Sequence, residues 1–135
     1  MKGKLLICAA VVLVIIAGSS AMFAHHGTNI SYDEKKSVTY EGTVTEFRWA
    51  NPHAQIYFDV KGAKGTVAHW GGELNSPGVL SKAGWNKRTF KAGDMITITL
   101  HPSRVEGVTV GLVDRSHPIL LNGKEILGTG GNNVD

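Results

Sequence analysis

Histidines are the most distinctive chemical resource of this chain, because all six lie beyond its first 24 residues. His25 and His26 are adjacent, and His53 follows an Asn-Pro pair. Imidazole nitrogens bind both Cu(II) and Zn(II), and Cu(II) comes highest in the affinity order of divalent first-row ions. We therefore expect a nitrogen-rich site for copper or zinc that is formed by His25 together with His26 or His53.

The start of the chain has the pattern of a secretory signal. Lys2 and Lys4 precede an unbroken apolar run of thirteen residues at 5–17, and small residues follow at 18–21. This order of charge, apolar run and small residues is typical of a cleavable signal peptide. The alternative is a transmembrane anchor, but a membrane span needs about 18 or more apolar residues. We expect residues 1–24 to be a signal peptide and the mature protein to be periplasmic.

The cleavage site decides whether His25 can act as a chelating N-terminus. Cleavage could follow Ala21, which obeys the rule of small residues better, or Ala24. Only the second cut leaves His25 with a free α-amine, whose ordinary pKa of about 7.7–8.0 allows deprotonation near neutrality. The amine and the imidazole of one residue could then hold one ion. The simpler alternative is a short N-terminal segment whose histidines bind nothing.

The other histidines have plainer interpretations. The imidazole of His53 could donate a hydrogen bond to a turn carbonyl instead of binding a ligand. His69 lies in a predicted strand and is typical of a packed or surface residue. His101 and His117 each precede a proline at a predicted strand end, and we assign no role to either.

Aromatic residues form a second candidate site. Core packing explains two of Trp49, Trp70 and Trp85, but a tryptophan at the mouth of a barrel, beside His53 and Glu73, would form a recognition surface. Glu73 could equally be a cap partner of the helix that follows it. The predicted ligand-binding set is Trp49, Tyr57, His69, Trp70 and Glu73.

Composition argues against several classes of protein. The sequence lacks the motifs of hydrolases, zinc proteases and phosphate-binding loops, and its only cysteine, Cys8, leaves with the leader. Removing Lys2 and Lys4 from the 14 basic residues leaves 12 against 11 acidic ones, so the mature charge is near +1. We expect no enzyme activity, no nucleic-acid partner and contact with the membrane only during export.

The elements that must position these residues are predominantly strands. After an extended arm at 25–36, alternating residues predict a long strand at 37–49, with a bulge or sharp bend at Gly42. Further strands are predicted at 53–60, 66–70, 95–100 and 108–113. Asn75 or Ser76 can cap one short helix that has Pro77 in its first turn and ends at Gly84. Asn122-Gly123 predicts a tight hairpin.

The predicted order is three strands, one helix and two further strands, and the first strand is long and bent. An OB-fold has this order. We therefore predict a small five-stranded OB-like β-barrel over residues 37–127 and a flexible tail at 128–135. The main alternative is an open sandwich. Closure into a barrel would remove exposed strand edges, which benefits an exported domain without disulfides.

Six short motifs, in order, carry a resemblance to a known family. They are Ala24-His25-His26, Gly42-Thr43-Val44, Trp49-Ala50-Asn51-Pro52-His53, Trp70-Gly71-Gly72-Glu73-Leu74-Asn75-Ser76-Pro77, Gly84-Trp85 and Lys91-Ala92-Gly93-Asp94. Over residues 24–126 the chain resembles the exported bacterial proteins called domain of unknown function 6152. The resemblance implies a small periplasmic β-barrel and no established activity. Gly27 departs from the family's usual Ser and aromatic, which weakens any role for the arm beyond His25 and His26.

These observations lead to two hypotheses. The first is a non-enzymatic periplasmic binding or accessory protein that holds Cu(II) or Zn(II) through histidines near its mature N-terminus. The second is a metal-independent module that binds a periplasmic protein or a small ligand on the aromatic face of the barrel.

Overall fold

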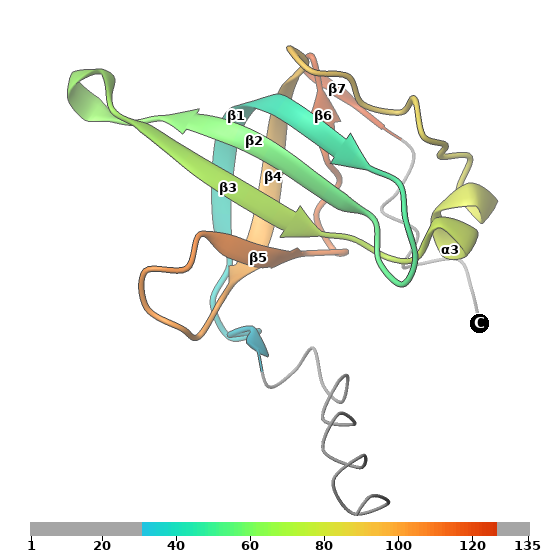
Figure 1. Ribbon diagram of the computed structural model, residues 1–135, viewed down its shortest axis with the longest axis horizontal. Helices are drawn as coiled ribbons and strands as arrows, with labels where there is room; N and C mark the ends of the chain where they lie inside the picture. Colours follow the sequence, from blue (N-terminus) through green and yellow to red (C-terminus); the bar gives the residue numbers. More distant parts are fainter. Residues whose placement is uncertain (1–30, 127–135) are drawn as a thin grey trace, which may run out of the picture.

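The computed structural model describes residues 31–126, and these form a β-barrel with one short helix (Figure 1). No helix in this part of the chain is long and apolar enough to span a bilayer. The elements are β1 (Val38–Arg48), β2 (Gln55–Lys61), the 3-10 turn η1 (Ala63–Gly65), β3 (Val67–Glu73), α3 (Pro77–Lys82), β4 (Met95–Pro102), β5 (Val110–Val113), β6 (Leu120–Leu121) and β7 (Lys124–Glu125).

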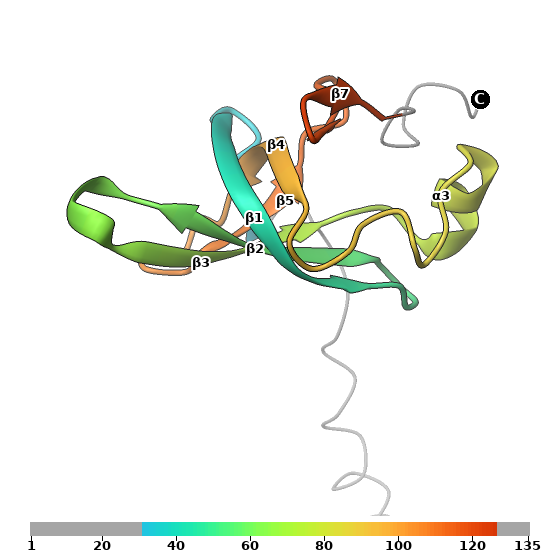
Figure 2. The same cartoon turned by 90° about the horizontal axis from the view of Figure 1, so that it is seen from above.

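Strand β1 belongs to both sides of the barrel. Its first half, residues 38–43, pairs with β4, and its second half, residues 43–48, pairs with β2. The strand order β1-β2-β3-β5-β4 is therefore closed by the β1–β4 pairing, with β3 and β5 parallel and the other pairs antiparallel. The five-stranded OB-like barrel predicted from the sequence is confirmed, and β1 curves across it in Figure 2.

The bend in β1 needs a glycine where two strands come close together. A Cβ at Gly42 would lie 2.7 Å from Cδ2 of Phe58 and 2.9 Å from the carbonyl oxygen of Asp59. The register irregularity itself falls between Val44 and Glu46. The predicted bend is therefore present, but the bulge lies a few residues beyond Gly42.

The core fills the barrel and extends under the helix. Its largest fully buried side chains come from three strands, the helix and the segment before β6: Phe58, Ile56, Leu80, Ile98, Leu100, Ile119 and Val44. Helix α3 begins as predicted, with the Ser76 hydroxyl accepting a hydrogen bond from the Val79 amide at 3.4 Å. It stops before Gly84, whose φ of +87° is a left-handed conformation that suits glycine.

Strand β3 runs three residues further than the sequence predicted. We expected it to end at Trp70, before Gly71-Gly72, but it continues to Glu73 because β2 and β5 both pair with this end. The two glycines face opposite sides of the sheet, and neighbouring side chains lie close to each of them. A Cβ at Gly71 would be 3.3 Å from the Tyr57 ring, and one at Gly72 would be 3.1 Å from Ile56 and Val113. The extension places Glu73 on a rigid strand.

The predicted tight hairpin is also present. Asn122 and Gly123 have φ angles of 50° and 79°, as the two central residues of a type I′ turn require. They connect β6 to β7, and β6 pairs with Ile96 and Thr97 of β4. The hairpin extends the sheet beyond the five barrel strands. The predicted tail, residues 128–135, lies outside the described residues.

The end of the predicted arm is packed against the barrel. Tyr32 is only 7% exposed and forms a β-bridge with Ser103. The Arg104 Nε donates a hydrogen bond to the Tyr32 carbonyl at 2.8 Å, and the Arg104 amide donates to the Ser31 carbonyl at 3.0 Å. From Ser31 onward the chain is therefore part of the folded domain.

Gly111 offers a test of how tightly β4 and β5 pack. A Cβ at Gly111 would lie 2.8 Å from Cβ of Leu100 and 2.9 Å from the His101 carbonyl oxygen. We expect Gly111→Ala to lower the free energy of unfolding by about 1–3 kcal/mol, because the backbone would have to move. Gly78→Ala in α3 is the control, since its nearest atom is 4.0 Å away. Urea unfolding should show no loss for the control, and equal curves would contradict this account.

Candidate functional site

His53, Glu73 and Tyr32 come together from three parts of the chain. His53 lies in the loop before β2, Glu73 is the last residue of β3, and Tyr32 precedes β1. The Tyr32 hydroxyl donates a hydrogen bond to Oε2 of Glu73 at 2.7 Å. Oε1 of the same carboxylate lies 3.7 Å from Nε2 of His53. The sequence therefore predicted the neighbourhood of His53 and Glu73 correctly, but it missed Tyr32.

The backbone determines which ring nitrogen of His53 is available. Nδ1 lies 3.2 Å from the Leu74 carbonyl oxygen, which can only accept, so Nδ1 carries the proton. In the neutral ring, Nε2 then has its lone pair free for a ligand. The side chain of His53 is 43% exposed and that of Glu73 is 18% exposed. The predicted hydrogen bond to a backbone carbonyl is thus present, but its acceptor lies in the connection after β3 and not in a turn, and it orients the ring without using Nε2.

Tyr32 is a donor in this group. Burial raises the pKa of Tyr32 well above its usual value of 10.0, and the hydrogen bond to the Glu73 carboxylate raises the pKa further. The phenol therefore keeps its proton at neutral pH. It holds Oε2 of Glu73 and leaves Oε1 facing His53.

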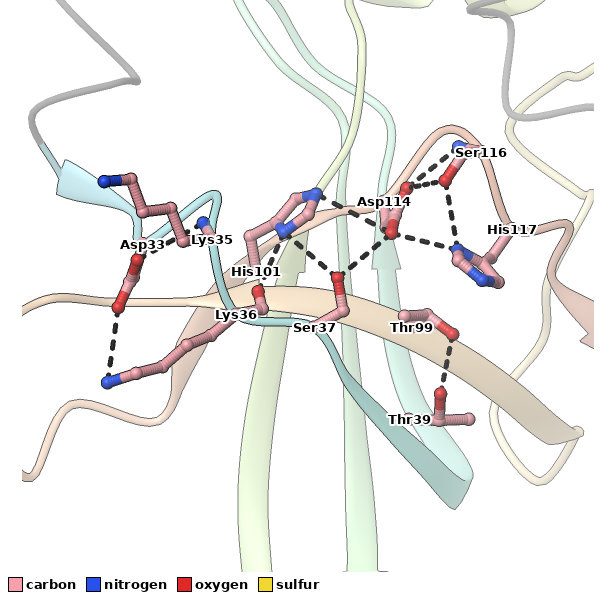
Figure 3. Close-up of polar contacts among 10 residues, drawn as sticks. All are labelled: Asp33, Lys35, Lys36, Ser37, Thr39, Thr99, His101, Asp114, Ser116 and His117. Carbon is pink, nitrogen blue, oxygen red and sulfur yellow. Dashed lines mark hydrogen bonds and ion pairs between the residues drawn. The ribbon is translucent and has the colours of Figure 1, made fainter.

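A second polar cluster is centred on the buried Asp114 (Figure 3). Oδ1 accepts hydrogen bonds from the amide and hydroxyl of Ser116 at 2.9 and 2.6 Å. Oδ2 lies 2.9 Å from Nδ1 of His117 and 3.3 Å from the Ser37 hydroxyl. His101 donates from Nδ1 to the Lys36 carbonyl at 2.9 Å, and its Nε2 is 3.7 Å from Oδ2. No motif or spacing in the sequence relates these residues to one another.

The electrostatics of Asp114 follow from its donors. Burial alone would raise the pKa of this carboxyl group, but the hydrogen bonds from Ser116 and His117, with the nearby His101, lower its pKa to about 2. Asp114 is therefore a stable anion that connects the start of β1, the end of β4 and the segment after β5.

The two clusters share the outer face of the barrel and are separated by one strand. Leu112 of β5 is in register with Glu73 on one side and with His101 on the other. A shallow hollow beside Glu73 is lined by Leu74, Asn75, Leu112, Val113 and Arg115. Within residues 31–126, no group of three or more His, Asp, Glu or Cys side chains is arranged to hold a metal. His25 and His26 lie outside the described residues.

The predicted ligand-binding set is divided between two faces. Phe58, which is fully buried, pairs with Trp70, whereas Tyr57 pairs with Gly71, so Trp70 faces inward and Tyr57 outward. The Trp70 ring packs against Tyr40 with centroids 4.5 Å apart. Trp49 packs edge-on against Phe47 at 5.8 Å, beside the core. The tryptophans therefore do not form one surface with Tyr57.

His69 and Tyr57 share the outer face with Glu73. His69 is exposed, and its Nδ1 is 2.5 Å from Oδ1 of Asp59 on the neighbouring strand. The guanidinium of Arg48 lies 5.2 Å from the centroid of the Tyr57 ring. Trp85, which we did not assign to the site, is buried against Phe90.

Residues 12–116 match the model of a family of unknown function, DUF6152. The chain belongs to DUF6152. The match confirms the resemblance that the motifs around His53 and Glu73 indicated. Among curated proteins, no match to the chain was found. Membership of DUF6152 brings no activity with it, so function has to be argued from the site.

The Asp114 cluster predicts a specific dependence of stability on pH. Because the folded pKa is about 2 and the unfolded one is near 3.8, the ionised carboxylate stabilises the fold by about 2 kcal/mol at neutral pH. This contribution is complete above the unfolded pKa and is lost as the pH falls through the folded pKa. In Asp114→Asn, we expect the stability deficit to shrink by about 2 kcal/mol between pH 5 and pH 1.

Urea unfolding of both proteins over this pH range is the measurement. Glu106→Gln, at an exposed position of the loop between β4 and β5, is the matched control. A deficit of Asp114→Asn that stays constant with pH would show that the carboxylate is not held as an anion by these donors.

Proposed function

We propose that this DUF6152 protein is a non-enzymatic periplasmic binding or accessory protein that holds Cu(II) or Zn(II). His53 supplies one ligand from the barrel, and His25, with or without His26, supplies the others from the mature N-terminus. The observation that carries the proposal is the orientation of His53, whose Nδ1 is engaged by the Leu74 carbonyl while Nε2 remains available. Ring nitrogens of metal-binding histidines are commonly fixed in this way.

The position of Tyr32 makes the N-terminal histidines suitable partners. His26 lies six positions before Tyr32, and a segment of that length can extend about 20 Å. Tyr32 is anchored to the barrel and is separated from His53 only by the Glu73 carboxylate. The segment is therefore long enough to bring His25 and His26 to Nε2 of His53.

Export supports the same proposal. The leader pattern of residues 1–24 directs the chain out of the cytoplasm, and cleavage after Ala24 creates the α-amine at His25. An amine and two imidazoles form a nitrogen-rich set, which Cu(II) favours. N-terminal mass analysis of the exported protein, followed by metal analysis of the same sample, tests processing and metal content together.

Titration with Cu(II) should distinguish the barrel ligand from other histidines. We expect the processed protein to bind about one equivalent of Cu(II), and His53→Ala to weaken binding by about 10-fold or more. His69→Ala is the matched control, because His69 is an exposed histidine paired with Asp59 on the same face. Equal Cu(II) affinity of His53→Ala and the wild type would exclude His53 from the site.

A second variant tests the N-terminal ligand. An additional alanine before His25 moves the α-amine away from the histidine ring, so the chelate of amine and imidazole is lost. We expect weaker binding of Cu(II) in isothermal titration, with an unchanged unfolding curve for the metal-free protein. An unaffected titration would remove the amine from the site.

One observation favours the metal-independent alternative. A Cβ at Gly71 would lie 3.3 Å from the Tyr57 ring and 3.5 Å from Cγ2 of Val110, so both side chains flank Gly71 on the outer face, and the Arg48 guanidinium lies over the Tyr57 ring. This surface could bind a periplasmic protein or a small aromatic ligand. Binding that survives loss of His25 and His26 but is lost in Tyr57→Ala would favour this alternative.

A further inference from the structure

We propose that a free edge of β3 pairs with the same edge of a second copy of this chain, so that the protein forms a weak dimer with two-fold symmetry. Closure of the barrel covers most strand edges, but β5 pairs only with residues 71–73 of β3. Within residues 31–126, residues 67–70 of β3 pair with β2 on one side and with no strand on the other. The dimer goes beyond the proposed metal site and does not depend on it.

The alternation of β3 determines which backbone groups face the free edge. The Gly71 amide donates to the Thr109 carbonyl at 3.0 Å, so it points toward β5 and away from β2. Because the backbone groups of every second residue point to the same side of a strand, the N–H and C=O groups of Val67 and His69 also point away from β2. Within residues 31–126, no backbone hydrogen bond connects either residue to the loop before β5. These groups are therefore available to a further strand.

The edge lacks the features that usually keep sheet edges apart. Natural edge strands commonly carry charged side chains, prolines or bulges. Strand β7, at the end of the sheet, consists of the exposed Lys124 and Glu125. Residues 67–70, by contrast, contain no proline, lysine, arginine or carboxylate, and they pair with β2 in unbroken register. This stretch of β3 is therefore suited to pairing.

Exposed apolar side chains lie beside the same edge. Val67 belongs to it, and Val105 and Val108 lie in the loop that reaches β3 at Thr109. They are three of the five large hydrophobic side chains that are exposed in residues 31–126. In both views the hairpin of β2 and β3 extends beyond the barrel, and this loop runs beside it (Figures 1 and 2). An added strand would bury apolar surface as well as pair the backbone.

The sequence of the edge fits a second copy of itself. In an antiparallel pair related by a two-fold axis, Val67 of one copy exchanges both backbone hydrogen bonds with His69 of the other, and Ala68 faces Ala68. The Cα atoms of such a central pair are about 4.5 Å apart, which is the closest spacing in a sheet, and alanine leaves room for it. The contact uses the same residues on both copies, so it closes as a dimer.

The ends of the paired stretch carry complementary charges. In this register, η1 of one copy lies next to the loop before β5 of the other, because these two segments flank opposite ends of the free edge. Lys64 in η1 and Glu106 in the loop are both exposed. Opposite charges at the rim of an interface favour this orientation of the two copies. Since only a few residues pair, we expect an interface below about 1,200 Å² and a dimer that dissociates on dilution.

A cysteine at position 68 tests the register. The mature chain has no cysteine, so Ala68→Cys carries a single thiol, and the paired Cα atoms are within the range of about 4.4–6.8 Å that a disulfide needs. Under mild oxidation we expect a covalent dimer to form at least about 10-fold faster than in Val38→Cys, which is the control at an exposed position of β1. Ala68 is exposed, so the reduced variant should unfold in urea as the wild type does. Equal rates of cross-linking in the two variants would overturn the pairing.

Charges at the same position distinguish a second copy from another partner. Ala68→Lys and Ala68→Glu each place like charges opposite one another, so we expect each variant alone to sediment as a monomer at concentrations where the wild type forms a dimer. A mixture of the two variants should form the dimer again, because opposite charges then meet. A mixture that stays monomeric contradicts the two-fold register. Wild-type protein that remains monomeric up to about 1 mM overturns the dimer and leaves the edge to a strand of another protein.

Discussion

The pairing of β1 with two strands is the constraint on which the rest of the structure depends. Thr43 is in register with Met95 of β4 and with Asp59 of β2, so the barrel closes at this residue. Closure is possible only because Gly42 lets β1 approach the backbone at Asp59. Once the barrel is closed, the registers of β3, β5 and β4 follow. They align Glu73, Leu112 and His101 in one row on the outer face.

The two histidine clusters in that region differ in what their rings are free to do. His117 is hydrogen-bonded to Asp114, and His101 lies between the Lys36 carbonyl and the same carboxylate. Asp114 has several donors of its own, so this cluster is satisfied internally and stabilises the junction of β1, β4 and β5. His53 has one engaged nitrogen and one available nitrogen. The same residue type therefore serves stability at one place and is available for binding at the other.

Local signals in the sequence predicted most of the fold. The cap at Ser76, the stop at Gly84 and the turn at Asn122-Gly123 each depend on a few neighbouring residues, and all three are present. The barrel followed from the order of the elements and the length of β1. By contrast, the end of β3 was misplaced, because Gly71 and Gly72 normally weaken a strand, and pairing with β2 on one side and β5 on the other retains them in it.

The candidate site was predicted only in part, because most of its contacts join distant residues. Tyr32 and Glu73 are 41 positions apart, and Ser37 and Asp114 are 77 apart, so no spacing rule relates them. The division of the aromatic set has a similar origin. Because side chains alternate along β3, Trp70 must point to the face opposite to that of His69 and Gly71. Which of these two faces is the inner one depends on the register that pairs Trp70 with Phe58. Register is a property of the closed barrel, not of a single strand.

The division of faces also determines how the two hypotheses relate to each other. Tyr57 and Glu73 lie on the same outer face, in adjacent strands, whereas Trp70 packs toward the core with Tyr40. Aromatic recognition on the barrel would therefore depend on Tyr57 and Arg48, close to the carboxylate that faces His53. His53 Nε2 lies 3.7 Å from Oε1 of Glu73, so an ion bound by His53, as proposed, would change the charge beside that surface.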